Sequence, residues 1–512
     1  MLEVLQMVEK EVLHPISIKK LSLKQMKKIL RSSMFLKEKF NSSGEFQKLK
    51  ARLVAGGDGQ DKSLYPVEDI TSPTADASSV FMIAHIAAHE GRHVGSGDVT
   101  GAYLNADMKA EVHMKLPKII AQILVSIMPE YKTFLLPSGE IVVQLDKALY
   151  GCVESARLWY EHLAMSMERL GFTRNPLDIC VFNKIDEYGK QCTVIVHVDD
   201  FLVTCATKET VEKFLVEIKE IYKEVNTVFG TLHSFLGMTL DFSEPRKVNI
   251  TMAKYVDDCL VEAKVEGIAA TPAAANLFDI GAHDTPKLDK QRHKLFHSRV
   301  YKLLYLARKT RPDMLTAVVF LTTRTQAPNE LDWTKLTRVY KYLNGTRDLG
   351  IVLQSINRLV VSAWIDASFG VHPEMKSHTG SVISLGKGPI YVKSSKQKLN
   401  SLASTESELI GLSDECRQVI WTRNFLLHQG YDIGPAIIKQ DNQSTIALAQ
   451  KGRSTSHRTR HIAIRYFFIK DRIDCGEIRL EYCPTDEMIA DVLTKPLQGE
   501  AFRKLRSELL NL

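Results

Sequence analysis

The sequence lacks the marks of several classes of protein. No apolar run approaches the roughly 20 residues that a membrane-spanning helix needs, and no signal peptide is visible. The eight cysteines form no Cys-x-x-Cys pair, which argues against a structural zinc site and against a disulfide framework. No internal repeat is apparent. These absences predict an intracellular protein without a membrane partner, in a reducing compartment.

The distribution of charge says more than the modest net charge of +7. Between residues 19 and 52 there are eleven Lys or Arg residues against two Glu, and a second basic stretch covers 451–472. Such stretches suit a polyanionic partner, although a lysine-rich stretch can also be a solvated face. At 512 residues the chain is too long for one core, which predicts about two to four domains.

Hydrophobic periodicity, and the Gly and Pro residues that interrupt it, divide the chain into expected helices, strands and loops. A capping box at 22–25 predicts the start of a short basic helix. Strand-like patterns, broken by Gly and Pro, cover 48–54, 99–116, 360–366 and 437–441. Helical spacing of apolar residues covers 150–172, 208–223, 252–264 and 296–346. Residues 269–286 are rich in Ala, Pro, Gly and Asp, which indicates a linker or a long loop.

The run Val-Asp-Asp occurs twice, and the two copies differ in their surroundings. The copy at 198–200 is flanked by β-branched apolar residues, which predicts the acidic tip of a β-hairpin. The copy at 255–258 matches the polymerase box Tyr-x-Asp-Asp, but the apolar residues around it have helical spacing. We therefore interpret Asp199 and Asp200 as the site and the second copy as a coincidence.

The acidic pair needs a further carboxylate before it can hold the metal ions of a two-metal reaction. Magnesium is usually held by one or two carboxylates together with substrate phosphates. The third acid must come from a neighbouring strand, and Asp98 stands at the start of an expected strand. Taken singly, Asp98 suits a turn, and Asp199 with Asp200 suits an ordinary hairpin tip. Their combination and order favour a metal site.

A second acidic set lies beyond residue 359 and consists of Asp366, Glu408, Asp441 and Asp491. Each member has a purely structural alternative. A capping box at 405–408 would use Glu408 to close a helix, and Asp441 would cap the next helix. Asp366 would end a strand at a turn, and Asp491 would be an exposed helix position. Taken alone, each of these alternatives stays open.

Short motifs follow one another along the chain in a fixed order. They are Lys50-Ala-Arg-Leu-Val-Ala55, Asp98-Val-Thr-Gly-Ala-Tyr-Leu-Asn105, Leu149-Tyr-Gly151, His197-Val-Asp-Asp200, Phe235-Leu-Gly237, Thr310-Arg-Pro-Asp313 and Tyr342-Leu-Asn-Gly-Thr346. In this order they resemble the reverse transcriptase of copia-type (Pseudoviridae-like) LTR retrotransposon Pol polyproteins. The resemblance covers nearly the whole chain from about residue 35.

The resemblance implies roles for the residues of these motifs. Asp98, Asp199 and Asp200 would bind two Mg²⁺ ions, with Mn²⁺ as the alternative metal. Tyr103 would exclude a ribose 2′-hydroxyl. The two basic residues of the first motif, Lys50 and Arg52, would clamp the triphosphate of a dNTP, for which Arg offers bidentate geometry.

The chain also departs from the family pattern near the expected substrate. Residues implied near the primer terminus or the incoming nucleotide are Phe235, Leu236, Gly237, Glu154 and Arg157. The family usually has Tyr at the position of His197, Gln at that of Glu154 and often Lys at that of Gly57. A carboxylate close to a triphosphate is unfavourable unless it is paired. All three expected metal ligands are nevertheless retained.

The second acidic set lies within motifs that resemble the ribonuclease H domain of the same family. These motifs are Trp364-Ile-Asp-Ala-Ser368, Lys396-Gln397, Ser404-Thr-Glu-Ser-Glu408, Asp441-Asn-Gln-Ser444, Arg460-His461 and Ala490-Asp491. The resemblance implies that Asp366, Glu408, Asp441 and Asp491 are catalytic and bind two Mg²⁺ ions. Glu406 is the alternative to Glu408, which is preferred because Leu409 follows it. Residues implied in phosphate contacts are Lys396, Arg458 and Arg460.

The fold that the resemblance implies has several domains of the α+β and α/β classes. A right-hand polymerase, with fingers, palm and thumb, would be followed by a helical connection and a C-terminal ribonuclease H-like domain. We expect the reverse transcriptase over 1–268, a linker with helical thumb or connection over 269–355, and the ribonuclease H-like domain over 356–512.

The expected function is to copy an RNA template from a DNA primer with dNTPs and to cleave RNA in the RNA–DNA hybrid. The alternative is a degenerate, catalytically silent copy that only binds nucleic acid or acts as a structural subunit. Retention of all seven acids favours the enzyme, whereas His197 and Glu154 favour the silent copy. No protease, integrase or Cys/His knuckle is visible, so we expect the C-terminal part of a larger polyprotein, or a truncated genomic copy. Other products of that polyprotein would be further partners.

Overall fold

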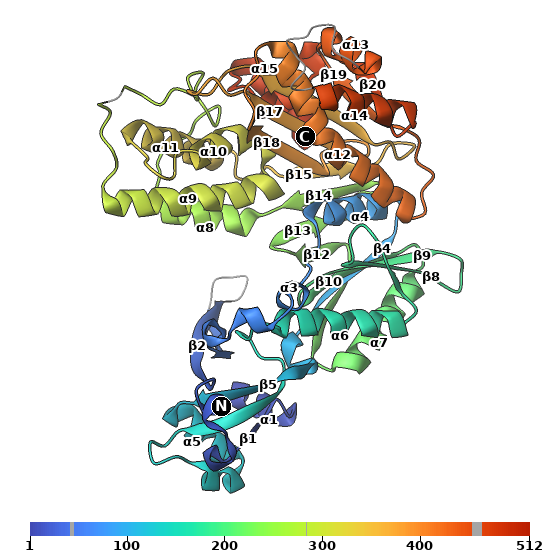
Figure 1. Cartoon of the computed structure of the whole chain (residues 1–512). Helices are drawn as coiled ribbons and strands as arrows, with labels where there is room; N and C mark the ends of the chain where they lie inside the picture. Colours follow the sequence, from blue (N-terminus) through green and yellow to red (C-terminus); the bar gives the residue numbers. More distant parts are fainter. Residues whose placement is uncertain (41–45, 283, 453–462) are drawn as a thin grey trace.

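The computed structural model describes residues 1–40, 46–282, 284–452 and 463–512. Four β-sheets follow one another from the N-terminal lobe at the bottom of Figure 1 to the C-terminal domain at its top. The chain folds into several domains of mixed α and β structure, as the sequence predicts. Within the described residues, no helix combines the length and the apolar character that a membrane span requires.

The N-terminal sheet forms the lower lobe and has its own apolar core. Its strands, in spatial order, are β1 (Leu13–Pro15), β6 (Ile141–Lys147), β5 (Asp107–Leu116), β2 (Leu30–Phe40) and β3 (Phe46–Ala55). The associated helices are α1 (Leu2–Glu9), α2 (Leu23–Met26), α3 (Val67–Ile70) and α5 (Lys118–Ile127). The capping box is confirmed, since Ser22 accepts from the backbone N–H of Gln25 and Gln25 accepts from that of Ser22. The antiparallel pair β2–β3 projects as a ribbon that carries Lys50 and Arg52.

The palm sheet lies above this lobe. Its strands, in spatial order, are β11 (Val225–Gly230), β4 (His93–Val99), β10 (Asp200–Cys205), β9 (Gln191–His197), β8 (Val181–Ile185) and β7 (Thr173–Arg174). The helices of this region are α4 (Ala77–Glu90), α6 (Ser155–Arg169) and α7 (Lys208–Tyr222). The strand-like pattern predicted at 99–116 is interrupted near its start, after Val99. Gly101 adopts φ 64° and begins a 3₁₀ turn, Ala102–Asn105, that separates β4 from β5.

The third sheet joins segments from both sides of the expected boundary at 268. Its strands are β12 (Leu232–Phe235), β13 (Met238–Asp241), β14 (Lys247–Thr251) and β15 (Ile351–Gln354), and β14 pairs with β15. The helices are α8 (Ala253–Ala263), α9 (Lys290–Lys309), α10 (Leu315–Thr322) and α11 (Glu330–Asn344). The second Val-Asp-Asp copy lies within α8, with Val256 buried, which confirms the helical prediction. The described residues of 269–286 contain no helix or strand.

The C-terminal sheet mixes antiparallel and parallel strands. In spatial order they are β18 (Tyr391–Lys396), β17 (His378–Ser384), β16 (Ser362–Ser368), β19 (Ala436–Gln440) and β20 (Ile478–Tyr482). The pairs β16–β19 and β19–β20 are parallel, so the ends of β16 and β19 point to the same edge. The helices are α12 (Ser404–His428), α13 (Gln443–Lys451), α14 (Ala463–Asp474) and α15 (Gly499–Leu510), and α12 packs on β16 and β17.

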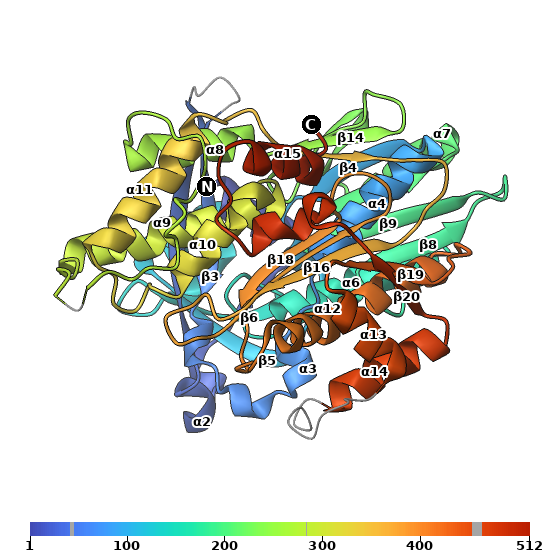
Figure 2. The same cartoon turned by 90° about the horizontal axis from the view of Figure 1, so that it is seen from above.

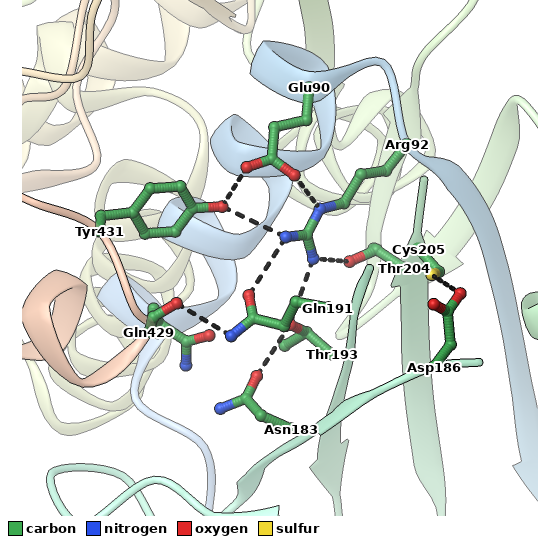
Figure 3. A network of polar contacts seen from close by, with 10 residues as sticks. All are labelled: Glu90, Arg92, Asn183, Asp186, Gln191, Thr193, Thr204, Cys205, Gln429 and Tyr431. Atoms are coloured by element: carbon green, nitrogen blue, oxygen red, sulfur yellow. Dashed lines mark hydrogen bonds and ion pairs between the residues drawn. The ribbon is translucent and has the colours of Figure 1, made fainter. Parts of the chain in front are cut away.

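A buried guanidinium connects the palm directly to the C-terminal domain (Figure 3). Arg92, at the end of α4, pairs with Glu90 at 2.8 Å and contacts the side chains of Gln191 and Tyr431, each at 3.2 Å. Tyr431 also donates to Glu90, and the amide of Gln191 donates to the carbonyl of Gln429 at 2.9 Å. A buried charge needs such partners. Seen from above, α4 lies near β14 (Figure 2), and it contacts β14 and β15 of the third sheet and β18 of the C-terminal sheet.

Candidate active sites

The first Val-Asp-Asp copy forms the turn between β9 and β10, as predicted. Both strands consist largely of buried β-branched and apolar residues, which suits a strand pair covered on both faces. Val198, between the strands, adopts φ 59°, a left-handed conformation that a β-branched residue rarely takes. The indole N–H of Trp159 on α6 donates to the carbonyl of Val198 at 2.6 Å. This bond holds the strained turn that presents Asp199 and Asp200.

The structure brings Asp98 to the same place from β4. Asp98 is directly opposite Asp200 in the β4–β10 register, and the backbone N–H of Val99 donates to the carbonyl of Asp199 at 2.9 Å. Asp98 lies near the end of β4 rather than at its start, which corrects the expectation from sequence. Burial, followed by the charges of Asp199 and Asp98, raises the pKa of Asp200 to about 6. A cation at this point would relieve the repulsion.

A line of side chains leads from these acids to the ribbon β2–β3. The ring of Tyr103 lies 4.7 Å from that of Tyr150, and the guanidinium of Arg52 lies 5.0 Å from the centre of the Tyr150 ring. Burial, and then the charge of Asp199, raises the pKa of Tyr103. Lys50 is opposite Lys37 in the ribbon. Tyr150 had not been singled out from the sequence, although it belongs to the motif Leu149-Tyr-Gly151.

Two residues expected near the nucleotide are engaged elsewhere. Glu154 is buried at the start of α6, where it accepts from the backbone N–H of Ala110 at 3.3 Å. The guanidinium of Arg157 pairs with Glu161 at 2.9 Å. Glu154 therefore links β5 to the start of α6, and its carboxylate has a hydrogen-bond partner within the protein.

The other departures from the family pattern also have local explanations. A Cβ atom on Gly57 would stand 1.9 Å from the carbonyl oxygen of Gly151, so the backbone leaves no room for a Lys side chain there. His197 is half-buried beside Lys309, and its Nδ1 has no hydrogen-bond partner among the described residues. Burial, and then the charge of Lys309, lowers the pKa of the imidazole.

The motif Phe235-Leu-Gly237 forms the tight turn between β12 and β13. Leu236 and Gly237 have φ 53° and 76°, and Phe235 is buried beneath them. The hydroxyl of Tyr305 on α9 donates to the carbonyl of Leu236 at 3.0 Å. The turn is thus fixed by a helix of the connection.

In the C-terminal domain, three of the four predicted acids converge on one edge of the sheet. Asp366 lies on β16, Glu408 in the first turns of α12 and Asp441 directly after β19, and their ligand atoms lie within 4.8 Å of one another. They line an open cavity of about 680 Å³. Burial, then Asp366 and then Asp441, raises the pKa of Glu408 to about 9. An all-oxygen donor set of this kind fits a hard divalent cation.

The fourth acid, Asp491, lies in the 3₁₀ segment Ile489–Leu493, outside the group of three, and is linked to Asp366 through the ammonium of Lys495. It is buried, which overturns the alternative of an exposed helix position. Burial, followed by the charge of Asp366, raises its pKa to about 7. The hydroxyl of Thr494 donates to Asp366, and the ammonium of Lys495 lies 2.6 Å from Asp491. Thr494 and Lys495 were missed from the sequence, although they follow Asp491 by three and four residues.

Other residues carry the capping roles that had been considered for two of these acids. Glu406, not Glu408, accepts from a backbone N–H before α12, that of Leu402 at 2.7 Å. Asn442, not Asp441, is the N-cap of α13 and accepts from Thr445 at 3.0 Å. The expected capping box at 405–408 is therefore wrong, and the carboxylates of Glu408 and Asp441 remain directed to the cluster.

The expected phosphate contacts are only partly described by the structure. Lys396, at the end of β18, pairs with Glu374 at 3.0 Å. Arg458 and Arg460 lie outside the described residues.

Comparisons with known proteins agree with this geometry. Residues 21–274 match the family described as reverse transcriptase (RNA-dependent DNA polymerase). The retrovirus-related Pol polyproteins from transposons RE2 and RE1 of Arabidopsis thaliana are each 29% identical over 478 residues, which is 92% of this chain and 31% of the polyprotein. That from transposon TNT 1-94 of Nicotiana tabacum is 25% identical over 96% of this chain and 36% of its own length.

A solved structure shows the same fold. It is a foamy viral protease-reverse transcriptase in complex with double-stranded DNA, which is 12% identical and has a TM-score of 0.53 over 94% of this chain and 68% of its own. The matched region of the present chain is therefore a reverse transcriptase domain. The chain belongs to the family of copia-type LTR retrotransposon Pol polyproteins and spans about a third of the length of the plant relatives.

Proposed function

We propose that the chain is a working RNA-directed DNA polymerase with an associated ribonuclease H activity. The observation that carries the polymerase activity is the register of β4 and β10, which sets Asp98 opposite Asp200. The side chains of Tyr103, Tyr150 and Arg52 form a line beside these acids. The observation that supports the nuclease is the convergence of three carboxylates within 4.8 Å. Its substrates would be an RNA template, a DNA primer, dNTPs and the resulting hybrid.

In the polymerase site, Asp98, Asp199 and Asp200 would hold Mg²⁺ or Mn²⁺. When bound, such ions activate the attacking oxygen and neutralise charge on the phosphate. Arg52 and Lys50 would bind the triphosphate, because the ribbon presents both on one strand with spacing two and therefore on one face. Tyr103, held against Tyr150, would abut the sugar of the incoming nucleotide.

In the nuclease site, Asp366, Glu408, Asp441 and Asp491 would hold the same kind of ion, and water would attack an RNA phosphodiester. The cavity is open, as a polymer substrate requires. Contacts to 2′-hydroxyls in the wide minor groove would select the RNA strand. Lys396, Arg458 and Arg460 remain proposed phosphate contacts, which position the substrate without reading its sequence.

The test is primer extension on a labelled RNA template with Mg²⁺, in which DNA synthesis and RNA cleavage are followed together. Asp199→Asn is expected to abolish synthesis and to leave cleavage of a preformed hybrid intact, and Asp366→Asn is expected to do the reverse. Asp257→Asn is the matched control, because this residue is exposed on α8 and, among the residues that the structure describes, pairs only with Arg347, at 3.7 Å. A native chain that binds hybrid but catalyses neither reaction would establish the silent copy instead.

A further inference from the structure

Lys495 carries the only positive charge among the described residues that line the cavity of the nuclease site. Its ammonium lies 2.6 Å from Oδ1 of Asp491 and 3.6 Å from Oδ2 of Asp366. The Glu408–Asp441 side of the cluster has no cation of the protein at such a distance within the described residues. The four acids are therefore compensated unevenly, by one ammonium placed between two of them.

The backbone that carries Lys495 is fixed, whereas its side chain can move. The backbone N–H of Lys495 donates to the carbonyl of Asp491 at 2.9 Å, so the two side chains lie one helical turn apart. The segment packs on β17 at Gly380, where a Cβ atom would stand 2.8 Å from the carbonyl of Ala490. The Lys495 side chain is 37% exposed and ends a flexible four-carbon stem. The ammonium can therefore leave the carboxylates while the site stays intact.

Binding of the ammonium and of a divalent cation at these atoms is mutually exclusive. A Mg²⁺ ion takes carboxylate oxygens at about 2.1 Å, in near-octahedral geometry. The ammonium of Lys495 already lies within hydrogen-bond distance of Asp491, and the hydroxyl of Thr494 donates to Asp366. A cation that binds on this side must displace Lys495, whereas one that binds between Glu408 and Asp441 need not.

We propose that Lys495 is a built-in counter-ion that occupies the Asp366–Asp491 side of the nuclease site and competes with divalent cations for these two carboxylates. The inference rests on the proposed nuclease function. It makes the two sides of the site unequal in metal binding, because only on the Asp366–Asp491 side must a metal ion displace the ammonium of Lys495. Lys495 thus stabilises the metal-free domain and weakens metal binding.

The test measures Mn²⁺ binding by calorimetry and by electron paramagnetic resonance in the full chain. Asp199→Asn serves as the background, so that the polymerase site contributes less. Lys495→Gln is expected to bind Mn²⁺ about tenfold more tightly, the equivalent of one ion pair of about 1.4 kcal/mol, and to melt at a lower temperature in EDTA. Lys495→Arg keeps the charge and should bind Mn²⁺ with nearly native affinity.

Lys393→Gln is the matched control. Lys393 lies in the same domain, outside the cavity, and pairs with the buried Glu415 at 2.6 Å. Its loss should lower the melting temperature without tightening Mn²⁺ binding, which separates competition from general destabilisation. Equal or weaker Mn²⁺ binding by Lys495→Gln would overturn the inference alone. If Asp366→Asn removes no Mn²⁺ binding from the chain, the nuclease function fails and the inference fails with it.

Discussion

In the C-terminal domain Asp366, Glu408 and Asp441 bring ligand atoms within 4.8 Å of one another, whereas Asp98, Asp199 and Asp200 of the palm do not form such a group. The nuclease acids come from two strands and a helix that converge on one edge. The palm acids come from a strand and a tight hairpin turn, where neighbouring side chains diverge. The fold itself thus brings the acids of the C-terminal site into one group, whereas the three acids of the palm are more widely spaced.

The largest expected effect separates the two sites through one glutamate. Glu408→Gln should lower the rate of RNA cleavage by about a hundredfold or more. Losing a residue that only supports a metal ligand can already lower activity by up to about a hundredfold. Primer extension should be unchanged. The measurement is cleavage of a preformed labelled hybrid, and Glu406→Gln is the control because it should weaken only the hydrogen bond from the backbone N–H of Leu402, worth about 1 kcal/mol. Loss of cleavage in the control alone would reverse the assignment.

The second expectation concerns the stability of the metal-free protein as a function of pH. The pKa of Glu408 is raised from 4.5 to about 9, mainly by burial, so the folded state binds a proton that the unfolded state releases. The resulting stability is fully present below pH 4.5 and is lost as the pH rises toward 9. In EDTA the melting temperature should fall by several degrees over this range.

The same melts compare the two sites directly. Glu408→Gln should flatten the pH dependence, whereas Asp200→Asn should change only its part between pH 3.8 and about 6, the range over which the pKa of Asp200 is raised. Equal effects of the two variants would show that the nuclease acids are no more crowded than those of the palm.

A smaller effect tests how the polymerase turn is held. Trp159→Phe removes the hydrogen bond to the carbonyl of Val198 while it keeps an aromatic ring against Tyr222. A hydrogen bond worth about 1 kcal/mol corresponds to a roughly fivefold loss in the rate of primer extension. Hybrid cleavage serves as the internal control. An equal loss of both activities would mean that Trp159 supports the whole fold rather than the turn.

The smallest effect addresses the connection between the two regions. Tyr431→Phe removes the hydroxyl that bridges Glu90 and Arg92, which should lower the free energy of unfolding by about 0.5 to 1 kcal/mol, because Glu90 and Arg92 still pair with each other. Urea unfolding of the full chain measures it. Arg423→Gln is a suitable control, since its guanidinium contacts an exposed loop carbonyl of the same domain, that of Gly434. If the two variants have the same free energy of unfolding, the network around Arg92 does not help to hold the domains together.

Local patterns in the sequence determined most of the helices and strands. The β-branched runs around Asp199 and Asp200 indicated a hairpin, and helical spacing around Asp257 indicated a helix, because period and propensity are properties of a short window of sequence. The order of motifs indicated the family, which the comparisons confirm over residues 21–274.

Only the tertiary structure decided which side chains meet. The sequence offers both Glu406 and Glu408, and the packing of α12 on β16 directs the second toward Asp366, while the first accepts from the backbone N–H of Leu402. Lys495 could not be found from its own neighbours, because its role depends on Asp366, which lies 129 positions away in the chain. The reason for a glycine at position 57 likewise becomes clear only in the folded chain, where the carbonyl oxygen of Gly151 approaches it closely. Contacts between distant segments depend on the packing of whole elements, and no short pattern of residues encodes them.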